Sequence, residues 1–226
     1  MRQFTIHPLT QERQVEAAKL LADEFNADPH TWNNAVKTPW DETSRWFREQ
    51  YVPERAREGH SFVAVCSATR ECVGALTVET MQFGVAHREL DTGDFNGTHV
   101  LVPQLDALFY GARPDAKTGF HAYMGFIAVH TAWRGTDVAR ALSAKAVAES
   151  ARRGCGYAVG HCESLVSASL ARKIGFEPVG RIVYADFQVS GGERPFASLP
   201  DCATVVALNL EPVRNEQQQQ QHVNRL

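Results

Sequence analysis

The stretch from residue 129 to residue 147, VHTAWRGTDVARALSAKAV, joins the end of an apolar strand to the start of a long helix. Gly135 lies in the turn, Arg134 precedes it, and small or apolar residues recur from Val138 onwards. The first turn of such a helix presents unpaired backbone N–H groups and the positive end of the helix dipole. Because phosphate groups bind readily at helix N-termini, the stretch predicts a phosphate or pyrophosphate site.

The residue types in the turn fit that prediction. Gly135 lets a ligand approach the backbone, Arg134 adds positive charge, and Ala139 is too small to obstruct the site. A plain strand–turn–helix contains the same residue types, so this alternative stays open from the turn alone. Rossmann and P-loop motifs are excluded, because the chain has neither GxGxxG nor GxxxxGK[ST].

Strands and helices alternate on both sides of this turn. The sequence predicts strands at residues 4–6, 61–67, 73–79, 120–129, 157–161, 177–187 and 203–210, and helices at about 15–25, 40–51, 100–110, 138–153 and 165–174. The strands at 61–67 and 73–79 are joined by a short polar turn and form an antiparallel hairpin. This alternation predicts an α/β fold with a mixed sheet.

The length of 226 residues fits one domain, which we place at residues 1–212. Residues at about 84–118 form an insertion of the kind that often borders a substrate site. Residues 213–226 contain five consecutive glutamines and are expected to be disordered.

Composition narrows the class of protein. The net charge of −3 leaves no basic footprint for nucleic acid, and no apolar run is long enough to span a membrane. The five cysteines have irregular spacing and no CxxC motif, which argues against a disulfide framework and against a metal site. No signal peptide is apparent at residues 1–10, so a cytoplasmic location is expected.

Two motifs carry a resemblance to a known family. Residues 134–139, RGTDVA, resemble the acetyl-CoA loop of GCN5-related N-acetyltransferases (GNAT), whose pattern is Arg/Gln-x-x-Gly-x-Gly/Ala. Residues 170–176, LARKIGF, are similar to the second GNAT motif, a helix that runs into Gly-Phe. The order of elements between residues 120 and 187 matches as well.

Within that superfamily the chain is most similar to insect-type arylalkylamine (dopamine) N-acetyltransferases. Those proteins have a Trp-Arg-Gly loop, a Cys-Ser-Ser-x-x-Ser-Ala segment, Lys-Leu-Gly-Phe and a Tyr/Phe-Ala-Asp strand. The corresponding segments here are WRG at 133–135, CESLVSA at 162–168, KIGF at 173–176 and YAD at 184–186.

The resemblance implies a GNAT fold, with a mixed central sheet of about six to seven strands flanked by helices and with strands four and five splayed apart. Acetyl-CoA is the implied cosubstrate. Its implied binding residues are Phe126, Ile127, Ala128, Val129, Arg134, Gly135, Thr136, Asp137, Val138, Ala139, Ser167 and Lys173.

The resemblance also implies catalytic residues. In insect-type relatives a carboxylate in a segment resembling Phe-x-x-Asp-Glu-Pro-Leu is implicated as the general base, and Asp28 precedes Pro29 in a similar segment here. Glu24 is the alternative base. Ser164 and Ser167 match serines near the thioester, although both positions also suit capping of the following helix.

Two departures from the family pattern affect these expectations. Asp137 replaces the second Gly of the loop and would repel a pyrophosphate, unless its side chain caps the helix. Ala171 replaces the Tyr that many members use as a general acid. The sequence HCE at 161–163 has the H-x-E of zinc deaminases, but no PCxxC follows, so that chemistry is excluded.

The resemblance therefore predicts direct transfer of an acetyl group from acetyl-CoA to a small primary amine, arylalkylamine- or polyamine-like, by a monomer or homodimer. Two alternatives remain. One is an N-acyltransferase with another acyl-CoA or acceptor, and the other is a degenerate, non-catalytic acyl-CoA-binding module.

Overall fold

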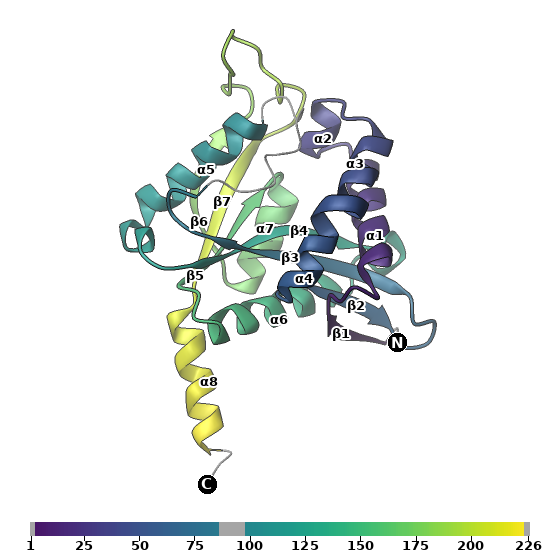
Figure 1. Ribbon diagram of the computed structural model, residues 1–226. Coiled ribbons are helices and arrows are strands. Elements are labelled where there is room, and N and C mark those ends of the chain that lie inside the picture. Colours follow the sequence, from purple (N-terminus) through teal and green to yellow (C-terminus); the bar gives the residue numbers. More distant parts are fainter. Residues whose placement is uncertain (1–2, 86–97, 224–226) are drawn as a thin grey trace.

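The computed structural model describes residues 3–85 and 98–223, in which a mixed sheet is covered by helices on both faces (Figure 1). Its strands are β1 Phe4–Pro8, β2 Phe62–Cys66, β3 Cys72–Met81, β4 His121–Val129, β5 Tyr157–Cys162, β6 Glu177–Val183 and β7 Cys202–Asn209. Their order is β1-β2-β3-β4-β5-β7-β6, and only β4 and β5 pair in parallel. The predicted mixed α/β fold is confirmed.

The helices occupy two layers. They are α1 Gln14–Ala27, α2 Trp32–Ala35, α3 Trp40–Trp46, α4 Val52–Glu58, α5 Thr98–Ala112, α6 Val138–Arg152, α7 Leu165–Ile174 and α8 Glu211–Val223, with short turns η1 Phe47–Tyr51, η3 Pro114–Lys117 and η4 Thr131–Trp133. Within the described residues, no helix is sufficiently long and apolar to cross a membrane.

Three hydrophobic clusters hold the layers together. On one face, Val138 and Leu142 of α6 are fully buried against β3 and β4. The opposite face is divided in two. One cluster packs α1, α3 and α4 over the first half of the sheet, and the other packs α5 and the segment after β6 over the second half. Both include residues of β4: Tyr123 belongs to the second and Ala128 to the first. β4 therefore marks the border between them.

Strands β4 and β5 separate soon after they meet. Only two residue pairs join them, Ala122 with Ala158 and Tyr123 with Val159. β4 nevertheless continues to Val129, paired with β3 alone. The predicted splay of strands four and five is confirmed, and it leaves the second half of β4 without a strand on its β5 side.

A buried polar network fixes an irregularity of β4 at this point. Between Leu76 and Val78 the β3–β4 register shifts, and Thr77 Oγ1 accepts a hydrogen bond from Phe126 N at 2.8 Å. The Tyr51 hydroxyl lies 2.9 Å from Thr77 Oγ1.

The rest of this network carries charge. Tyr51 donates to Glu79 Oε1 at 2.6 Å, and Arg55 Nη1 lies 2.8 Å from Glu79 Oε2. The Arg55 and Glu79 side chains are almost completely buried. The network therefore ties α4 and η1 to the irregular part of the sheet.

Gly125→Ala should disrupt that arrangement. A Cβ at this position would lie 2.5 Å from the Tyr51 hydroxyl and 3.0 Å from Glu79 Oε1. We expect a loss of about 2 kcal/mol in the free energy of unfolding, as for other overpacked interiors, measured by urea denaturation. Gly111→Ala in α5 is the control, because nothing lies within 4 Å and alanine favours a helix. Equal stabilities for the two variants would contradict the prediction.

Two predicted elements differ from the structure by four residues or more at one end. The strand expected at 177–187 ends at Val183, because Asp186 N and Phe187 N both donate to the Val183 carbonyl and turn the chain. The helix expected at 40–51 continues to Glu58 through the π-helical turn η1. Pro53 follows that turn and has no N–H to donate to the preceding turn of the helix, which is a physical reason for the irregularity.

The C-terminal segment also departs from the prediction. Residues 213–226 were expected to be disordered, whereas residues 211–223 form α8 (Figure 1). Glutamine and glutamate favour helices, and Val213 packs against the core. Arg214 donates to the carbonyls of Ala151 and Cys155 at 3.2 and 2.7 Å. The low complexity of this segment gave no indication of the contacts that Val213 and Arg214 make.

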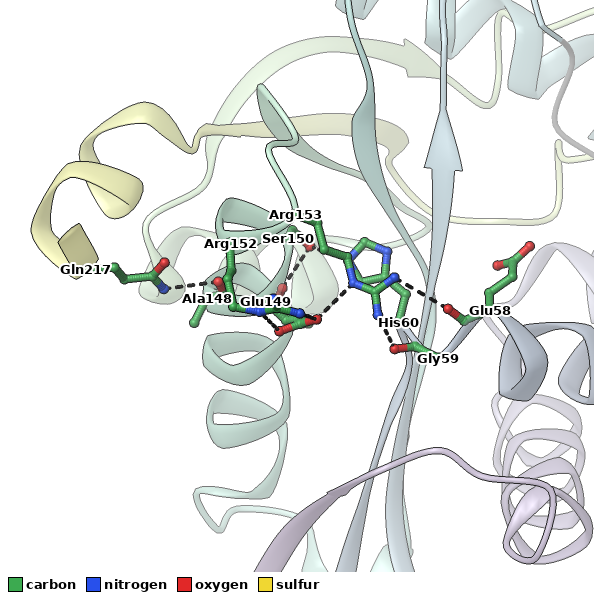
Figure 2. A network of polar contacts seen from close by, with 10 residues as sticks. Glu58, Gly59, His60, Ala148, Glu149, Ser150, Arg152, Arg153 and Gln217 are labelled. Carbon is green, nitrogen blue, oxygen red and sulfur yellow. Dashed lines mark hydrogen bonds and ion pairs between the residues drawn. The ribbon is translucent and has the colours of Figure 1, made fainter. Parts of the chain in front are cut away.

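Figure 2 shows how the C-terminal half of α6 is bound from two sides. Gln217 of α8 donates to the Ala148 carbonyl at 3.0 Å. Arg153 donates to the carbonyls of Glu58 and Gly59 and, at 2.8 Å, to Glu149 Oε1. The end of α6 is thus joined to α8 and to the turn after α4.

Arg214→Ala should measure the contribution of α8. The substitution removes the guanidinium donor of the Cys155 carbonyl, whereas the Ala151 carbonyl still accepts from Gly154 N, so we expect a loss of about 1–2 kcal/mol in unfolding free energy. Gln219→Ala, on the exposed side of the same helix, should have almost no effect in the same urea titration. A similar loss in both variants would contradict an anchoring role for Arg214.

Candidate functional site

The turn between β4 and α6 has the conformation that the sequence predicts. Gly135 has a φ of +75°, a region that favours glycine, and open space surrounds it. Glu24 of α1 reaches this turn: its Oε1 accepts from Thr131 N at 2.9 Å and its Oε2 from Arg134 Nη2 at 2.6 Å. Glu24, an expected alternative base, is therefore engaged in holding the turn and orienting Arg134.

The N-terminus of α6 is not capped by a side chain. Asp137 occupies the N-cap position without a side-chain capping bond, so it does not turn back onto the helix. Its Oδ1 instead lies 3.1 Å from Arg140 Nε, in an exposed ion pair. The pair partly neutralises the carboxylate, and the backbone N–H groups of the first helical turn, at Val138 and Ala139, remain available for an anion.

The second half of β4 leads into this turn. Phe126 packs against aromatic side chains of α1, α3 and η1, with ring centroids 5.0–5.8 Å away. Ile127 and Val129 pack toward α6, and Ala128 is buried on the opposite face. Side chains thus anchor both faces of the strand, while its β5 side has no pairing strand. This is what the backbone role expected for residues 126–129 requires.

The two expected serines cap α7. Ser164 Oγ accepts from Ser167 N at 3.3 Å, and Ser167 Oγ accepts from Ser164 N at 3.1 Å. Ser167 also donates to the Ser164 carbonyl at 2.9 Å. Both serines therefore have a structural role at the start of α7.

The remaining α7 residues give little further chemistry. Ala171, where many family members have Tyr, packs against the core, and Lys173 is exposed in the last turn of the helix.

Cys162 is the last residue of β5, and burial raises the pKa of its thiol to about 12. Cys162 is therefore unsuited to carry an acyl group, because its thiolate is not formed near neutral pH.

Asp28 lies at the C-terminal end of α1, in the turn that leads to α2. Its side chain is exposed, and its Oδ1 accepts from His30 N at 2.9 Å. The Asp28 carbonyl accepts from the Asn34 amide at 2.6 Å, which fixes this turn.

Glu163 is the residue that sequence analysis missed. It lies between β5 and α7, and its Oε2 accepts from Trp32 N at 2.7 Å. Burial raises the pKa of its carboxyl to about 7; the Trp32 N–H opposes this rise, and the negative charge of Asp28 adds to it. A group that titrates near neutrality is suited to exchange protons with a substrate.

A signal for Glu163 was present in the sequence. The family segment Cys-Ser-Ser-x-x-Ser-Ala has a serine where this chain has Glu163. Its immediate surroundings are fixed by distant residues: Tyr184 donates to the Glu163 carbonyl at 2.8 Å and accepts from Trp32 Nε1 at 2.8 Å. Residues separated by more than 100 positions thus meet at this carboxyl.

Another buried polar group lies where β4 and β5 part. His161 Nε2 lies 3.2 Å from Asp106 Oδ1 of α5, and Tyr123 OH lies 3.3 Å from His161 Nδ1. The contact joins α5 to both splayed strands.

Comparison with known proteins identifies the family. The model of the acetyltransferase (GNAT) family matches residues 19–176, well over half of the chain. The chain belongs to the GNAT family. It is accordingly an N-acetyltransferase, and the matched region includes the splayed strands, the α6 turn and Glu163.

Solved structures agree with the GNAT fold. The chain is 15% identical to a mosquito arylalkylamine N-acetyltransferase-like 5b, with a TM-score of 0.72, over 92% of this chain and 100% of the other. It is 14% identical to arylalkylamine N-acetyltransferase 2 of Aedes aegypti, with a TM-score of 0.76, and the alignment again covers 92% of this chain and 100% of the other. A Drosophila melanogaster polyamine N-acetyltransferase that forms N-acetylagmatine is 14% identical, with a TM-score of 0.71 and the same coverage of both chains. At these identities the likeness concerns the fold.

Asp137→Asn should strengthen binding of coenzyme A. The substitution removes a negative charge at the start of α6 and frees Arg140, so we expect a two- to five-fold gain in affinity, on the order of 0.3–1 kcal/mol. Titration calorimetry at low and high salt measures it, with a smaller gain at high salt.

The control for this variant is Glu216→Gln. It makes the same change in net charge on α8, which packs along the C-terminal half of α6, away from the turn. Unchanged or weaker binding in Asp137→Asn would show that the Asp137 carboxylate does not face the anion.

Proposed function

We propose that this protein transfers the acetyl group of acetyl-CoA directly to the primary amine of a small cationic molecule, arylalkylamine- or polyamine-like. The observation that carries the proposal is the combination of an unpaired β4 edge with an uncapped helix N-terminus directly after it. Together they match two parts of acetyl-CoA, its amide-containing pantetheine arm and its pyrophosphate.

The residues fit acetyl-CoA part by part. The backbone at 126–129 has N–H and C=O groups that can pair with the pantetheine amides, since no strand pairs with them on the β5 side. The pyrophosphate suits the turn at 134–139, where Gly135 leaves open space and Arg134 supplies positive charge.

The acceptor is inferred from charge and from relatives. Asp28 and Glu163 place negative charge at the end of β5, and a protonated primary amine is attracted to it. Solved neighbours include arylalkylamine and polyamine N-acetyltransferases, which act on amines of both kinds. The two carboxylates favour a cationic acceptor of either class.

The chemistry needs three steps. A carboxylate takes a proton from the ammonium group, the amine attacks the thioester carbonyl carbon, and the leaving thiolate receives a proton. Direct transfer is favoured because the Cys162 thiol is buried and has a raised pKa. Ser167, whose hydroxyl lies at the start of α7, is proposed to relay the proton to the thiolate.

Thiol release with an amine panel tests the proposal. We expect saturable release of coenzyme A with agmatine, a polyamine or an arylalkylamine, and slower release when a longer acyl-CoA replaces acetyl-CoA. Acetyl-CoA binding is measured in parallel by calorimetry. Binding without turnover would favour the non-catalytic module, faster reaction with a longer acyl-CoA would favour another acyltransferase, and no binding would overturn the assignment of the loop.

A further inference from the structure

Glu163 lies on the face of the sheet that bears α1, α2 and α5. Successive residues of a strand point to opposite faces. Cys162 belongs to the cluster under α6 and α7, whereas His161 contacts Asp106 of α5 on the other face. Glu163 follows this alternation toward α2, four residues beyond Val159, the last partner of β4. It therefore lies on the β5 side of the splay.

The position of the carboxyl group is fixed, but only one of its oxygens is used. Oε2 accepts from Trp32 N at 2.7 Å, and Tyr184 holds the Glu163 carbonyl at 2.8 Å. Within residues 3–85 and 98–223, Oε1 has no hydrogen-bond partner. The residue keeps some exposed surface, although protein surrounds the carboxyl group. One oxygen is thus oriented and available to a ligand.

The side chains named around Glu163 add either negative charge or none. Asp28, in the turn before α2, adds negative charge. Burial raises the pKa of both Tyr184 and Cys162, so neither side chain ionises near neutral pH. From α7, Ser164 contributes only an uncharged hydroxyl.

In the part of the chain that the structure describes, no Lys or Arg forms an ion pair with Glu163, and His161, two positions earlier, is paired with Asp106. A buried carboxylate without a cation costs stability, and perturbed groups of this kind gather at functional sites.

We propose that Glu163 is the catalytic base of the transfer reaction, and that Asp28 is a positioning residue that acts through it. The inference rests on the proposed function and deepens it, because it reassigns the base from Asp28 to a residue at the position of a family serine. Asp28 is exposed, whereas protein surrounds the Glu163 carboxyl group, so Asp28 is the weaker candidate.

The proton balance is simple. The Glu163 carboxylate accepts one proton from the ammonium form of the substrate, which frees the lone pair on nitrogen. The C–N bond forms and the C–S bond breaks; the second nitrogen proton passes to the thiolate sulfur. Glu163 then releases its proton to water, so each turnover yields an amide, a thiol and one proton.

Two isosteric variants test the assignment in the intact protein. Glu163→Gln keeps an oxygen for the Trp32 N–H but cannot accept the proton, so we expect kcat to fall at least about 100-fold, with acetyl-CoA affinity within two-fold of wild type. Asp28→Asn should lower kcat far less than Glu163→Gln does, because it removes a neighbouring charge and leaves the proposed proton acceptor in place. The acid limb of its kcat/KM profile should move to lower pH, because removing the Asp28 charge lowers the pKa of Glu163.

Each outcome has a distinct meaning. Wild-type turnover with near-normal kcat in Glu163→Gln would overturn this inference and leave the proposed function intact. A 100-fold loss in Asp28→Asn with an active Glu163→Gln would make Asp28 the base. An unmoved acid limb in Asp28→Asn would overturn its action through Glu163. Absence of wild-type turnover with every amine, despite acetyl-CoA binding, would overturn the proposed function itself.

Discussion

The early separation of β4 from β5 is the constraint on which the rest of this structure depends. Backbone N–H and C=O groups inside a protein need partners, and a central strand normally finds them on both sides. Here pairing stops after Tyr123 and Val159, so half of β4 has a partner strand only in β3. The fold can sustain this because β4 is anchored by side chains on both faces. Under the proposed function, the pantetheine amides pair with the backbone groups that the sheet leaves open.

The irregularity at Phe126 shows how the fold maintains the separation. The register shift gives the Phe126 N–H a side-chain acceptor, Thr77, instead of a backbone carbonyl. The Tyr51 hydroxyl of η1 contacts Thr77 and donates to Glu79, and Arg55 of α4 neutralises Glu79. Buried ion pairs of this kind seldom add net stability, because desolvation offsets their attraction. Their use here is geometric: they define the path of β4 where it has separated from β5.

Local patterns predicted most of the elements, and long-range contacts decided the rest. The turn at Gly135 and the helix after it follow from residue type alone, since a positive φ and an apolar stripe are local properties. By contrast, α8 depends on Arg214 reaching the carbonyls of α6, which a glutamine run does not indicate. Glu24 was expected as an alternative base, and its contact with Arg134, 110 residues away, could not be predicted from local sequence.

Glu163 illustrates the same limit for the site. Its chemistry comes from burial, from a backbone N–H of Trp32 and from the charge of Asp28, none of which is close to it in sequence. The only local indication was a glutamate in place of a family serine. A departure from a family pattern therefore deserves a physical explanation as much as a match does.

The two neighbouring carboxylates connect stability to function in this protein. Asp28 and Glu163 repel each other, and in the described part of the chain no Lys or Arg pairs with Glu163. Burial of the Glu163 carboxyl group, to which the charge of Asp28 adds, raises its pKa, and the free chain carries the cost of this arrangement. A cationic acceptor would provide the missing positive charge when it binds, and loss of its proton to Glu163 would then remove both charges at once. The same electrostatic cost that weakens the free fold can thus favour both binding of the amine and its activation.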